Sequence, residues 1–444
     1  MFIRKLKKEM TECRIIQVQK FLHEAKFSHP QIGYNQVIKQ KIQLCKGTRF
    51  INLYLKVTNK CNFNCYFCSQ NCSDYGELSF ADAKRILDDV HKLGFINIFY
   101  TGGEPLLNKD INKILKYGRS LGFNQCLVTN GYLIDKYPDI IGDIDKFGIS
   151  LHGDSSVYEK IIGKPNTYQK IIENILLLRA QNKNVEINYT LCEENNNVQQ
   201  LAYVADFCKK EELQLSVARL NYVGKAKHME KQNVNELCKY INTLNNKNYS
   251  INVSNCIVPC VVENKYQHLC HGCGAGITTI AVDYSGNVTI CASSDKVIGN
   301  VLSGSFKAIL HKIEANEKKR IKDLPQCCRI CKFLVSCKGG CKIECENSFS
   351  CDYLLNDEFE TFCKFIYDKY IILKTNKFLI KNQNIILPVP FRSVDNRYQD
   401  VLIKLNGSMT GNQIISSYDD ENEILQLLFC LYKDNYLLVR EDRL

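Results

Sequence analysis

The chain has 444 residues, a length that predicts two or three folding units and not one small core. Its formal charge is +11, but the lysines are scattered without a dense basic run, which favours a solvated surface over a nucleic-acid site. No segment approaches the roughly 20 apolar residues that cross a bilayer, and no apolar stretch follows the basic opening. We therefore expect a cytoplasmic protein with no nucleic-acid or membrane partner.

Cysteine is the most informative residue of the composition, with 24 copies. The cytosol keeps thiols reduced, so metal-binding or catalytic roles are expected in place of disulfides. The segment CNFNCYFC places Cys61, Cys65 and Cys68 four and then three residues apart. Three thiolates can hold three irons of a [4Fe-4S] cube and leave the fourth iron free for a small molecule. A zinc site is the alternative, because Cys72 follows closely as a fourth thiol.

The order of elements after residue 51 predicts an α/β fold. Apolar spacing over 80–94 predicts a helix that ends at Gly94. Six strands, each followed by a helix, predict right-handed crossovers and a parallel sheet, here a partial (β/α)6 TIM-like barrel that is open on one side. The expected strands are 51–57, 96–103, 126–131, 146–153, 185–191 and 213–220.

Polar and glycine-rich residues follow several of these strands. They include Thr58 to Cys61, Gly102 to Pro105, 129–131 and 150–153. Because the carboxyl ends of the strands of a parallel barrel share one rim, we expect the active site there. The open side of the barrel would admit a large substrate.

The triad after one strand, with Gly102-Gly103-Glu104-Pro105 after the next, resembles the radical S-adenosylmethionine (SAM) superfamily. The resemblance implies that Cys61, Cys65 and Cys68 hold a [4Fe-4S] cluster whose open iron chelates the amino and carboxylate groups of SAM. One electron from this cluster then releases methionine and a 5'-deoxyadenosyl radical, which abstracts hydrogen from the substrate.

The same resemblance implies further SAM contacts. Phe67 matches an aromatic residue that packs against adenine, and Ser150 matches a serine that touches the SAM carboxylate. Glu104 stands beside two glycines, where the backbone can approach closely, and a carboxylate there can pair with the SAM ammonium. Two positions depart from the family pattern: Ile162 replaces a frequent arginine, and His152 a frequent aspartate. The expected cofactor-binding residues are Phe67, Gly102, Gly103, Glu104, Pro105, Asn130 and Ser150.

A second group of cysteines resembles the SPASM extension, which holds auxiliary [4Fe-4S] clusters. Its pattern is Cys273-Gly-Ala-Gly, Gly286-x4-Cys291 and Cys328-x2-Cys331-x5-Cys337-x3-Cys341. A predicted hairpin over 277–291, with its turn at 285–287, lies inside this pattern. The resemblance implies one cluster on Cys270, Cys273, Cys291 and Cys341, and another on Cys328, Cys331, Cys337 and Cys351. Cys345 competes with Cys351, and Cys270 competes with Cys260 or an open iron site, whereas Cys72 and Cys327 are interpreted as spectators.

Four parts are predicted along the chain: an N-terminal segment (1–50), the radical SAM barrel (51–225), the SPASM domain (226–365) and a C-terminal α+β domain (366–444). The last part is expected to contain a strand, a turn at Asn406-Gly407, two helices and a final strand. Three roles remain open for it, namely recognition of a leader peptide, dimerisation, or packing onto the body of the protein.

The layout most resembles peptide maturases of this superfamily. We expect an enzyme that abstracts hydrogen from a short ribosomally made precursor peptide and forms a crosslink such as a thioether, with flavodoxin or ferredoxin as the reductant. Formylglycine formation of the anaerobic sulfatase-maturase type is an alternative. A non-catalytic iron-sulfur protein for electron transfer is the alternative from a different class.

Overall fold

The computed structural model describes Phe50 and residues 51–444 except for 71, 73–74, 231, 325–327, 329–332, 344–364, 374–378, 382–383, 388–391, 396–397, 420, 434–435 and 442–444. The predicted N-terminal segment, apart from Phe50, lies outside this part. The chain forms two compact units, one of residues 1–255 and 274–317 and the other of residues 256–273 and 318–444. The four-part domain division stays a prediction.

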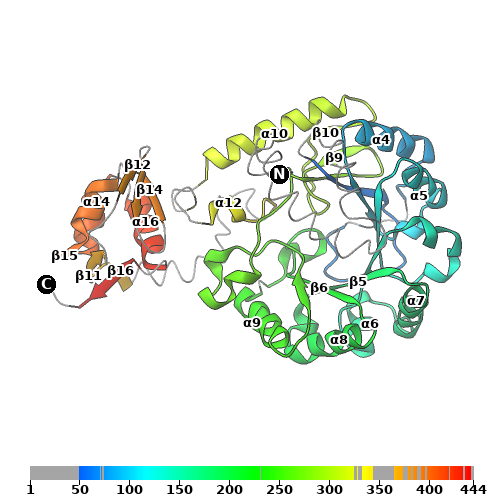
Figure 1. The fold of residues 1–444 in the computed structure, drawn as a ribbon, viewed down its shortest axis with the longest axis horizontal. Helices are drawn as coiled ribbons and strands as arrows, with labels where there is room; N and C mark the ends of the chain where they lie inside the picture. Colours follow the sequence, from blue (N-terminus) through cyan, green and yellow to red (C-terminus); the bar gives the residue numbers. More distant parts are fainter. Residues whose placement is uncertain are drawn as a thin grey trace, which may run out of the picture. The chain divides into compact units, whose positions relative to one another are not determined.

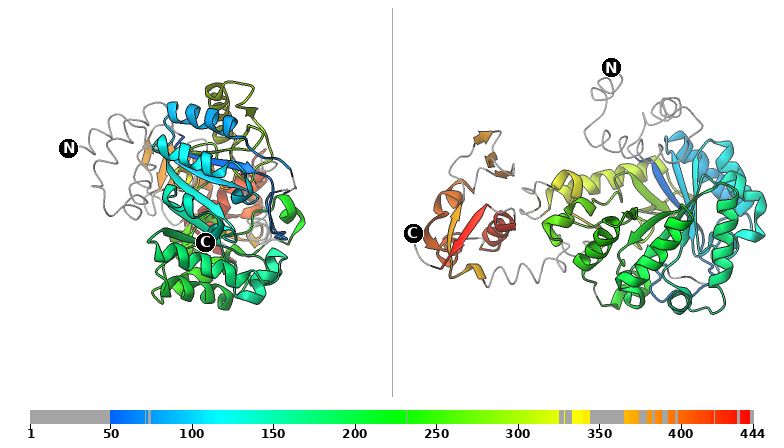
Figure 2. Two further views of the ribbon diagram at one scale, coloured as in Figure 1. Left: turned by 90° about the vertical axis from the view of Figure 1, so that its right-hand side faces the viewer. Right: turned by 60° about the horizontal axis from the view of Figure 1, so that its bottom comes forward.

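A parallel sheet organises the first unit, and Figures 1 and 2 show its strands inside a ring of helices. Each of the six strands pairs with the next one in chain order, always in parallel. This order confirms the predicted partial (β/α)6 barrel. The strands are β1 Asn52–Thr58, β2 Asn97–Gly102, β3 Asn124–Thr129, β4 Lys146–Ser150, β5 Asn184–Thr190 and β6 Gln214–Ala218.

Amphipathic helices cover the outer face of this sheet (Figure 1). The α4 helix shows why they form: the Ser79 side chain caps its first turn by accepting from the Asp82 amide at 3.1 Å, Ile86 and Val90 are buried, and Gly94 follows its end with a φ of 83°. None of the described helices has the length and apolar character of a membrane span. The bounds are α4 Phe80–Lys92, α5 Ile111–Ser120, α6 Ser155–Ile162, α7 Tyr168–Ala180, α8 Val198–Lys210, α9 Val234–Asn245 and α10 Phe306–Lys322.

Four further strands extend the sheet at its two ends. β7 Ile251–Val253 pairs in parallel with β6, and β8 Thr279–Val282 pairs in parallel with β1. β9 Asn287–Thr289 and β10 Gly299–Asn300 follow as antiparallel neighbours. The hairpin expected over 277–291 is therefore confirmed. The sequence did not reveal that this hairpin continues the barrel sheet, because parallel pairing between distant strands leaves no local signal.

The inner face of the sheet is polar near the start of the strands. Along β1 the apolar residues Leu53 and Leu55 are fully buried, so alternation places Asn52 on the opposite face. There the Asn97 amide donates to Asn52 at 2.8 Å and the Asn124 amide donates to Asn97 at 2.9 Å, which forms a ladder across three strands.

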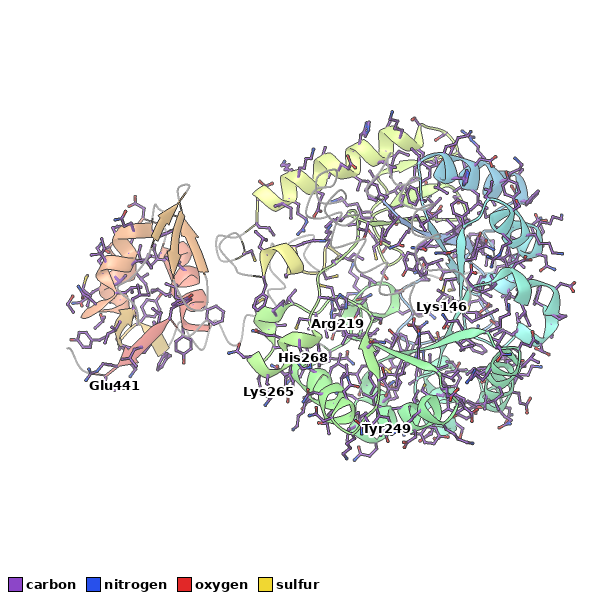
Figure 3. The ribbon with its side chains drawn as sticks, viewed as in Figure 1. Lys146, Arg219, Tyr249, Lys265, His268 and Glu441 are labelled. Carbon is purple, nitrogen blue, oxygen red and sulfur yellow. The ribbon has the colours of Figure 1, made fainter. Side chains whose placement is uncertain are left out.

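An ion pair lies further along the same sheet. The Lys146 ammonium of β4 pairs with the Glu186 carboxylate of β5 at 2.9 Å. Figure 3 labels Lys146 within the ring of helices. Both side chains are only partly exposed, so the pair neutralises two charges that water solvates incompletely.

The C-terminal residues of the second unit build an α+β core. One antiparallel sheet has the order β15-β11-β16, and another has the order β12-β13-β14. The strands are β11 Tyr370–Leu373, β12 Leu379–Lys381, β13 Asn384–Leu387, β14 Arg392–Asp395, β15 Asn406–Thr410 and β16 Leu437–Arg440, and the helices of this unit are α12 Leu334–Cys337, α14 Gln399–Lys404, α15 Gly411–Ile415 and α16 Glu421–Lys433. Short 3₁₀ turns across the chain are η1 Pro105–Leu107, η2 Ile134–Lys136, η3 Pro138–Asp143, η4 Glu193–Asn195, η5 Gly224–His228, η6 Pro259–Val261 and η7 Asn264–Leu269.

The strand expected before Asn406 is wrong. Val401 and Leu402 of α14 and Leu405, which follows its end, are all buried, and this spacing is typical of one face of a helix and not of alternating faces of a strand. The expected turn residues Asn406 and Gly407 instead open β15. The two following helices and the final strand β16 are confirmed.

We predict that Asn97→Ala lowers the free energy of unfolding by about 1–3 kcal/mol, because it removes the two hydrogen bonds that join Asn97 to Asn52 and to Asn124. Thermal unfolding of the anaerobic holoenzyme checks this. Gln169→Ala, an exposed change on α7, is the control. Equal unfolding midpoints for the two variants would show that the ladder is not stabilising.

Candidate functional site

The three triad cysteines share one loop that begins directly after β1. Their side chains are partly exposed. The Phe63 amide donates to the Cys61 sulfur at 3.5 Å, and the Gln70 amide donates to the Cys68 sulfur at 3.4 Å. An amide that donates to sulfur stabilises the thiolate, which is the form that binds metal.

Cys72 is an unexpected member of this group. Its thiol donates to the sulfurs of Cys61 and Cys68, and this contact is the main cause that lowers the pKa of Cys61 and lowers that of Cys68 to about 6. Burial raises the pKa of Cys65 to about 12. Among the described residues no three Cys, His, Asp or Glu side chains surround a single metal-ion position. Cys61, Cys68 and Cys72 therefore form a hydrogen-bonded group, and Cys65 lies outside it.

The glycine turn after β2 packs directly on the residues that precede Cys61. The Gly103 amide donates to the Thr58 carbonyl at 2.9 Å, and the Glu104 amide donates to the Lys60 carbonyl at 2.7 Å. A Cβ on Gly102 would lie 2.2 Å from the Thr58 oxygen, and one on Gly103 would lie 2.1 Å from the Lys60 oxygen. Only glycine permits this approach, so both glycines fix the start of the cysteine loop.

Two other segments hold the far side of the loop. The Asn64 amide donates to the carbonyl of Ile162 at the end of α6, at 3.0 Å. Ile162 itself is buried, so the position where arginine is frequent contributes backbone and packing here. After β6, the Lys225 amide donates to the Cys68 carbonyl at 2.9 Å, and a Cβ on Gly224 would lie 2.6 Å from that same oxygen.

Glu104 is fully buried where β2 and β3 end. Its carboxylate accepts from the Leu106 amide at 3.1 Å, from the Thr129 hydroxyl at 2.7 Å and from the Asn130 amide at 2.8 Å. Burial raises the pKa of Glu104 to about 7, and these three donors partly oppose the rise. The carboxylate thus joins two strand ends, a role that the sequence did not reveal. Its contact with SAM stays a prediction.

Phe67 and His152 are neighbours although they come from different strand ends. Their ring centroids lie 5.3 Å apart in an edge-to-face arrangement. His152 is buried and its Nδ1 accepts from the Thr190 amide at 3.1 Å, so the proton of the neutral ring lies on Nε2. Burial lowers the pKa of His152 to about 4, which keeps the ring uncharged at neutral pH. His152 therefore orients Phe67. Ser150 lies partly exposed at the end of β4, and Pro105 begins η1.

The second group of cysteines is divided between the two units. Cys291 follows β9 in the first unit, and the Ser293 amide donates to its sulfur at 3.5 Å, as in the triad. The Gln70 side chain donates to the Ala292 carbonyl at 3.0 Å, which ties the segment after Cys68 to the segment after Cys291. Among the candidate ligands that the structure describes in the second unit, Cys341 is buried, and the partly exposed cysteines are Cys260, Cys270, Cys273, Cys328 and Cys337. Cys331, Cys345 and Cys351 lie outside the described residues, so the auxiliary ligand sets stay predictions.

Two family models match the chain. Residues 55–203 match the radical SAM superfamily, and residues 273–333 match SPASM, an iron-sulfur cluster-binding domain. The first match contains the triad and Glu104, and the second begins at Cys273. The chain is a radical SAM enzyme with a SPASM domain. This confirms the predicted family and sets aside the non-catalytic electron carrier.

Relatives of this radical SAM enzyme carry out different reactions. The AdoMet-dependent heme synthase of Methanosarcina barkeri is 24% identical over 320 residues, which cover 64% of this chain and 89% of the synthase. The GTP 3',8-cyclase of Synechocystis sp. is 24% identical over 202 residues, which cover 42% of this chain and 59% of the cyclase. The chain thus spans most of the synthase but only 45% and 56% of two other curated relatives.

Solved structures confirm the radical SAM fold. SuiB of Streptococcus suis, solved with its precursor peptide SuiA, has a TM-score of 0.57 and 19% identity, with 72% of this chain and 80% of SuiB covered. anSMEcpe, solved with AdoMet and the Kp18Cys peptide, has a TM-score of 0.52 and 18% identity, with 71% of this chain and 97% of that chain covered.

The residues present fit the cofactors of a radical SAM/SPASM enzyme, which are a [4Fe-4S] cluster, SAM and auxiliary iron-sulfur clusters. The triad supplies three sulfurs on one loop, two of them with lowered thiol pKa values. Beside Cys61, the amide nitrogen of Asn62 is buried without a hydrogen-bond partner in the described part of the chain, although its oxygen accepts from Asn130 at 2.8 Å. When bound, the cluster supplies the electron that cleaves SAM.

We predict that Gly103→Ala reduces iron bound at the triad by at least half, because its Cβ would displace the Lys60 carbonyl that precedes Cys61. Iron and sulfide analysis after anaerobic reconstitution measures this loss. Gly142→Ala is the matched control, since a Cβ there meets nothing within 4 Å. Full iron loading of Gly103→Ala would contradict the proposed support of the loop.

Removal of single cysteines separates the two kinds of site. Cys65→Ala is expected to abolish SAM cleavage, because it removes one of three ligands. Cys331→Ala is expected to lower the iron content and to spare SAM cleavage in the absence of substrate. Iron analysis and detection of 5'-deoxyadenosine check both results. A full iron complement in Cys331→Ala would remove this residue from the auxiliary ligand set.

Proposed function

We propose that this enzyme modifies a short ribosomally made precursor peptide by hydrogen abstraction and forms a crosslink such as a thioether. The observation that carries the proposal is the fold shared with SuiB, a protein that was solved with its precursor peptide. The likeness covers 72% of this chain and 80% of SuiB. The fold of anSMEcpe adds support from a second structure with a bound peptide, since anSMEcpe was solved with the Kp18Cys peptide. Both likenesses extend well beyond the radical SAM match at residues 55–203.

A thioether link balances as a two-electron oxidation of the peptide. One hydrogen atom leaves carbon for the 5'-deoxyadenosyl radical, the thiol loses its proton, and the new carbon–sulfur bond releases one electron. Auxiliary clusters can accept that electron. Each cleavage of SAM needs one electron. We propose that flavodoxin or ferredoxin donates this electron in the reducing cytosol.

The chain's own residues would prepare this chemistry in three ways. The glycine turn and Gly224 hold the triad loop against the sheet from two sides. Neutral His152 orients Phe67 and adds no charge near a bound adenine. Glu104 keeps the ends of β2 and β3 together, so the rim holds its shape while ligands bind.

We also propose that the C-terminal α+β residues bind the leader part of the peptide. In the described part of the chain, β16 is an edge strand of its sheet and pairs with β11, so its outer edge can accept another strand. Leu438 of β16 is 46% exposed and lies opposite Ile372, away from the apolar core that contains Leu437. Dimerisation through the same edge is the competing role, and a dimer in peptide-free solution would favour it.

The test combines the anaerobically reconstituted enzyme, SAM and a reductant with a short cysteine-bearing peptide, which is sought as a reading frame beside the gene of the enzyme. We expect a product lighter by two hydrogen atoms per link and a matching loss of free thiol, both measured by mass spectrometry. The Cys65→Ala enzyme is the control. A product that has exchanged sulfur for an aldehyde oxygen would indicate formylglycine formation instead.

Heme chemistry is the second candidate, because the match to the AdoMet-dependent heme synthase covers 89% of that protein. It requires a porphyrin substrate and predicts no change in any peptide. Incubation of the same enzyme with iron-coproporphyrin and SAM, followed by chromatography of the pigments, tests it. Conversion of the porphyrin, with the peptide unmodified, would replace our proposal.

A further inference from the structure

Lys56 is a cation on the inner face of the sheet. Its neighbours Leu55 and Val57 are fully buried toward the helices, so alternation along β1 directs Lys56 to the opposite face. Other lysines of this region have carboxylate partners, as Lys60 has in Glu77 and Lys146 has in Glu186, each at 2.9 Å. No hydrogen bond or ion pair to the Lys56 ammonium occurs within the described residues.

The groups that act on Lys56 include one cysteine from each cysteine group. The acidic groups whose charges act on its ammonium are Asp283, Cys291, Asp295 and Cys68, in order of decreasing effect, while burial lowers its pKa. The pairing of β1 with β8 explains the first of these, because Leu55 lies opposite Val282 and Asp283 follows Val282.

The Asp283 carboxylate accepts hydrogen bonds from the hairpin turn. Its Oδ1 accepts from the Ser285 and Asn287 amides, each at 2.9 Å, and its Oδ2 accepts from the Asn287 side chain at 3.1 Å. The carboxylate is therefore committed to holding the turn between β8 and β9 and makes no ion pair with Lys56 within the described residues.

The loop after Cys68 and the segment after Cys291 are also in direct contact, through the Gln70 side chain and the Ala292 carbonyl. Cys68 belongs to the triad, and the SPASM match includes Cys291. All of these residues belong to the first unit of the fold. Lys56 therefore lies on the inner face of the barrel, within electrostatic range of one sulfur from each cysteine group.

We propose that Lys56 is a counter-cation shared by the SAM-binding cluster and the auxiliary cluster that Cys291 ligates, and that its charge raises the reduction potential of both. A [4Fe-4S] core held by three or four thiolates is anionic, and reduction adds another negative charge. A fixed cation nearby stabilises the reduced form more than the oxidised form. A partly buried cation with no ion-pair partner in the described part of the chain is costly, and two anionic clusters would offset that cost.

The test is a potentiometric titration of the reconstituted holoenzyme without any peptide, followed by electron paramagnetic resonance. Added SAM changes the spectrum of the triad cluster alone, which separates its signal from the auxiliary signals. We expect Lys56→Met to shift the midpoint potentials of the triad cluster and of one auxiliary cluster to more negative values, and Lys56→Arg to keep the wild-type values. Lys113→Met is the matched control, since it removes one lysine charge from the exposed surface of α5.

Each result decides the proposal. Unchanged potentials in a fully loaded Lys56→Met enzyme would overturn it, and would leave the binding of an anionic substrate group as the role of this lysine. If Lys56→Met fails to load iron, Lys56→Gln and Lys56→Arg are analysed for iron. Loss of iron in Lys56→Met and Lys56→Gln but not in Lys56→Arg shows a requirement for charge and supports the proposal. Loss of iron in all three variants shows a packing role and overturns it. Because no substrate is present, none of these outcomes depends on the proposed peptide chemistry.

Discussion

Close backbone contact between the glycine turn after β2 and the end of β1 is the constraint on which this active site depends. The triad lies on a loop with no regular secondary structure, and such a loop needs an external support to present three sulfurs together. Gly102 and Gly103 provide it, because any side chain there would overlap the Thr58 or Lys60 carbonyl. The two amides of this turn then satisfy carbonyls that the sheet leaves unpaired.

The electrostatics of the loop follow from the same arrangement. Amide donors two residues further on recur at Cys61, Cys68 and Cys291, so one local motif favours the thiolate in both cysteine groups. Positive charge comes from Lys225, whose ammonium also lowers the pKa of Cys68. At Cys65 the effect of burial outweighs the opposing charge of Lys225 and raises the thiol pKa, so its deprotonation depends most on bound iron. The site is thus partly prepared for metal before any metal binds.

The sequence was sufficient for the barrel because its signals are local. Each strand of the barrel is a short apolar run, and Gly94 marks the end of α4 where the helical spacing stops. The cysteine triad and the glycine turn were equally visible, since their spacing along the chain is itself the motif. The loop and its supports therefore appear where parallel topology requires them.

What the sequence did not reveal involves partners far apart in the chain. The spacing of Cys72 predicts a spectator, because its contacts with Cys61 and Cys68 depend on how the loop turns back. The sequence motif links Glu104 to SAM alone, whereas its bonds to Thr129 and Asn130 join two strand ends. The parallel pairing of β8 with β1 and the helical state of α14 were missed for the same reason, since tertiary packing overrode local preference.

The contact of Gly224 with the Cys68 carbonyl also bears on the order in which the chain is synthesised and folds. The ribosome delivers the cysteines long before it delivers the residues that support them from the far end of the barrel. In a nascent chain that ends before β6, the loop would lack the support of Gly224 and Lys225. Its thiols would then be exposed to oxidation and to other metals. Iron insertion is therefore best suited to a chain that has already closed this part of the fold.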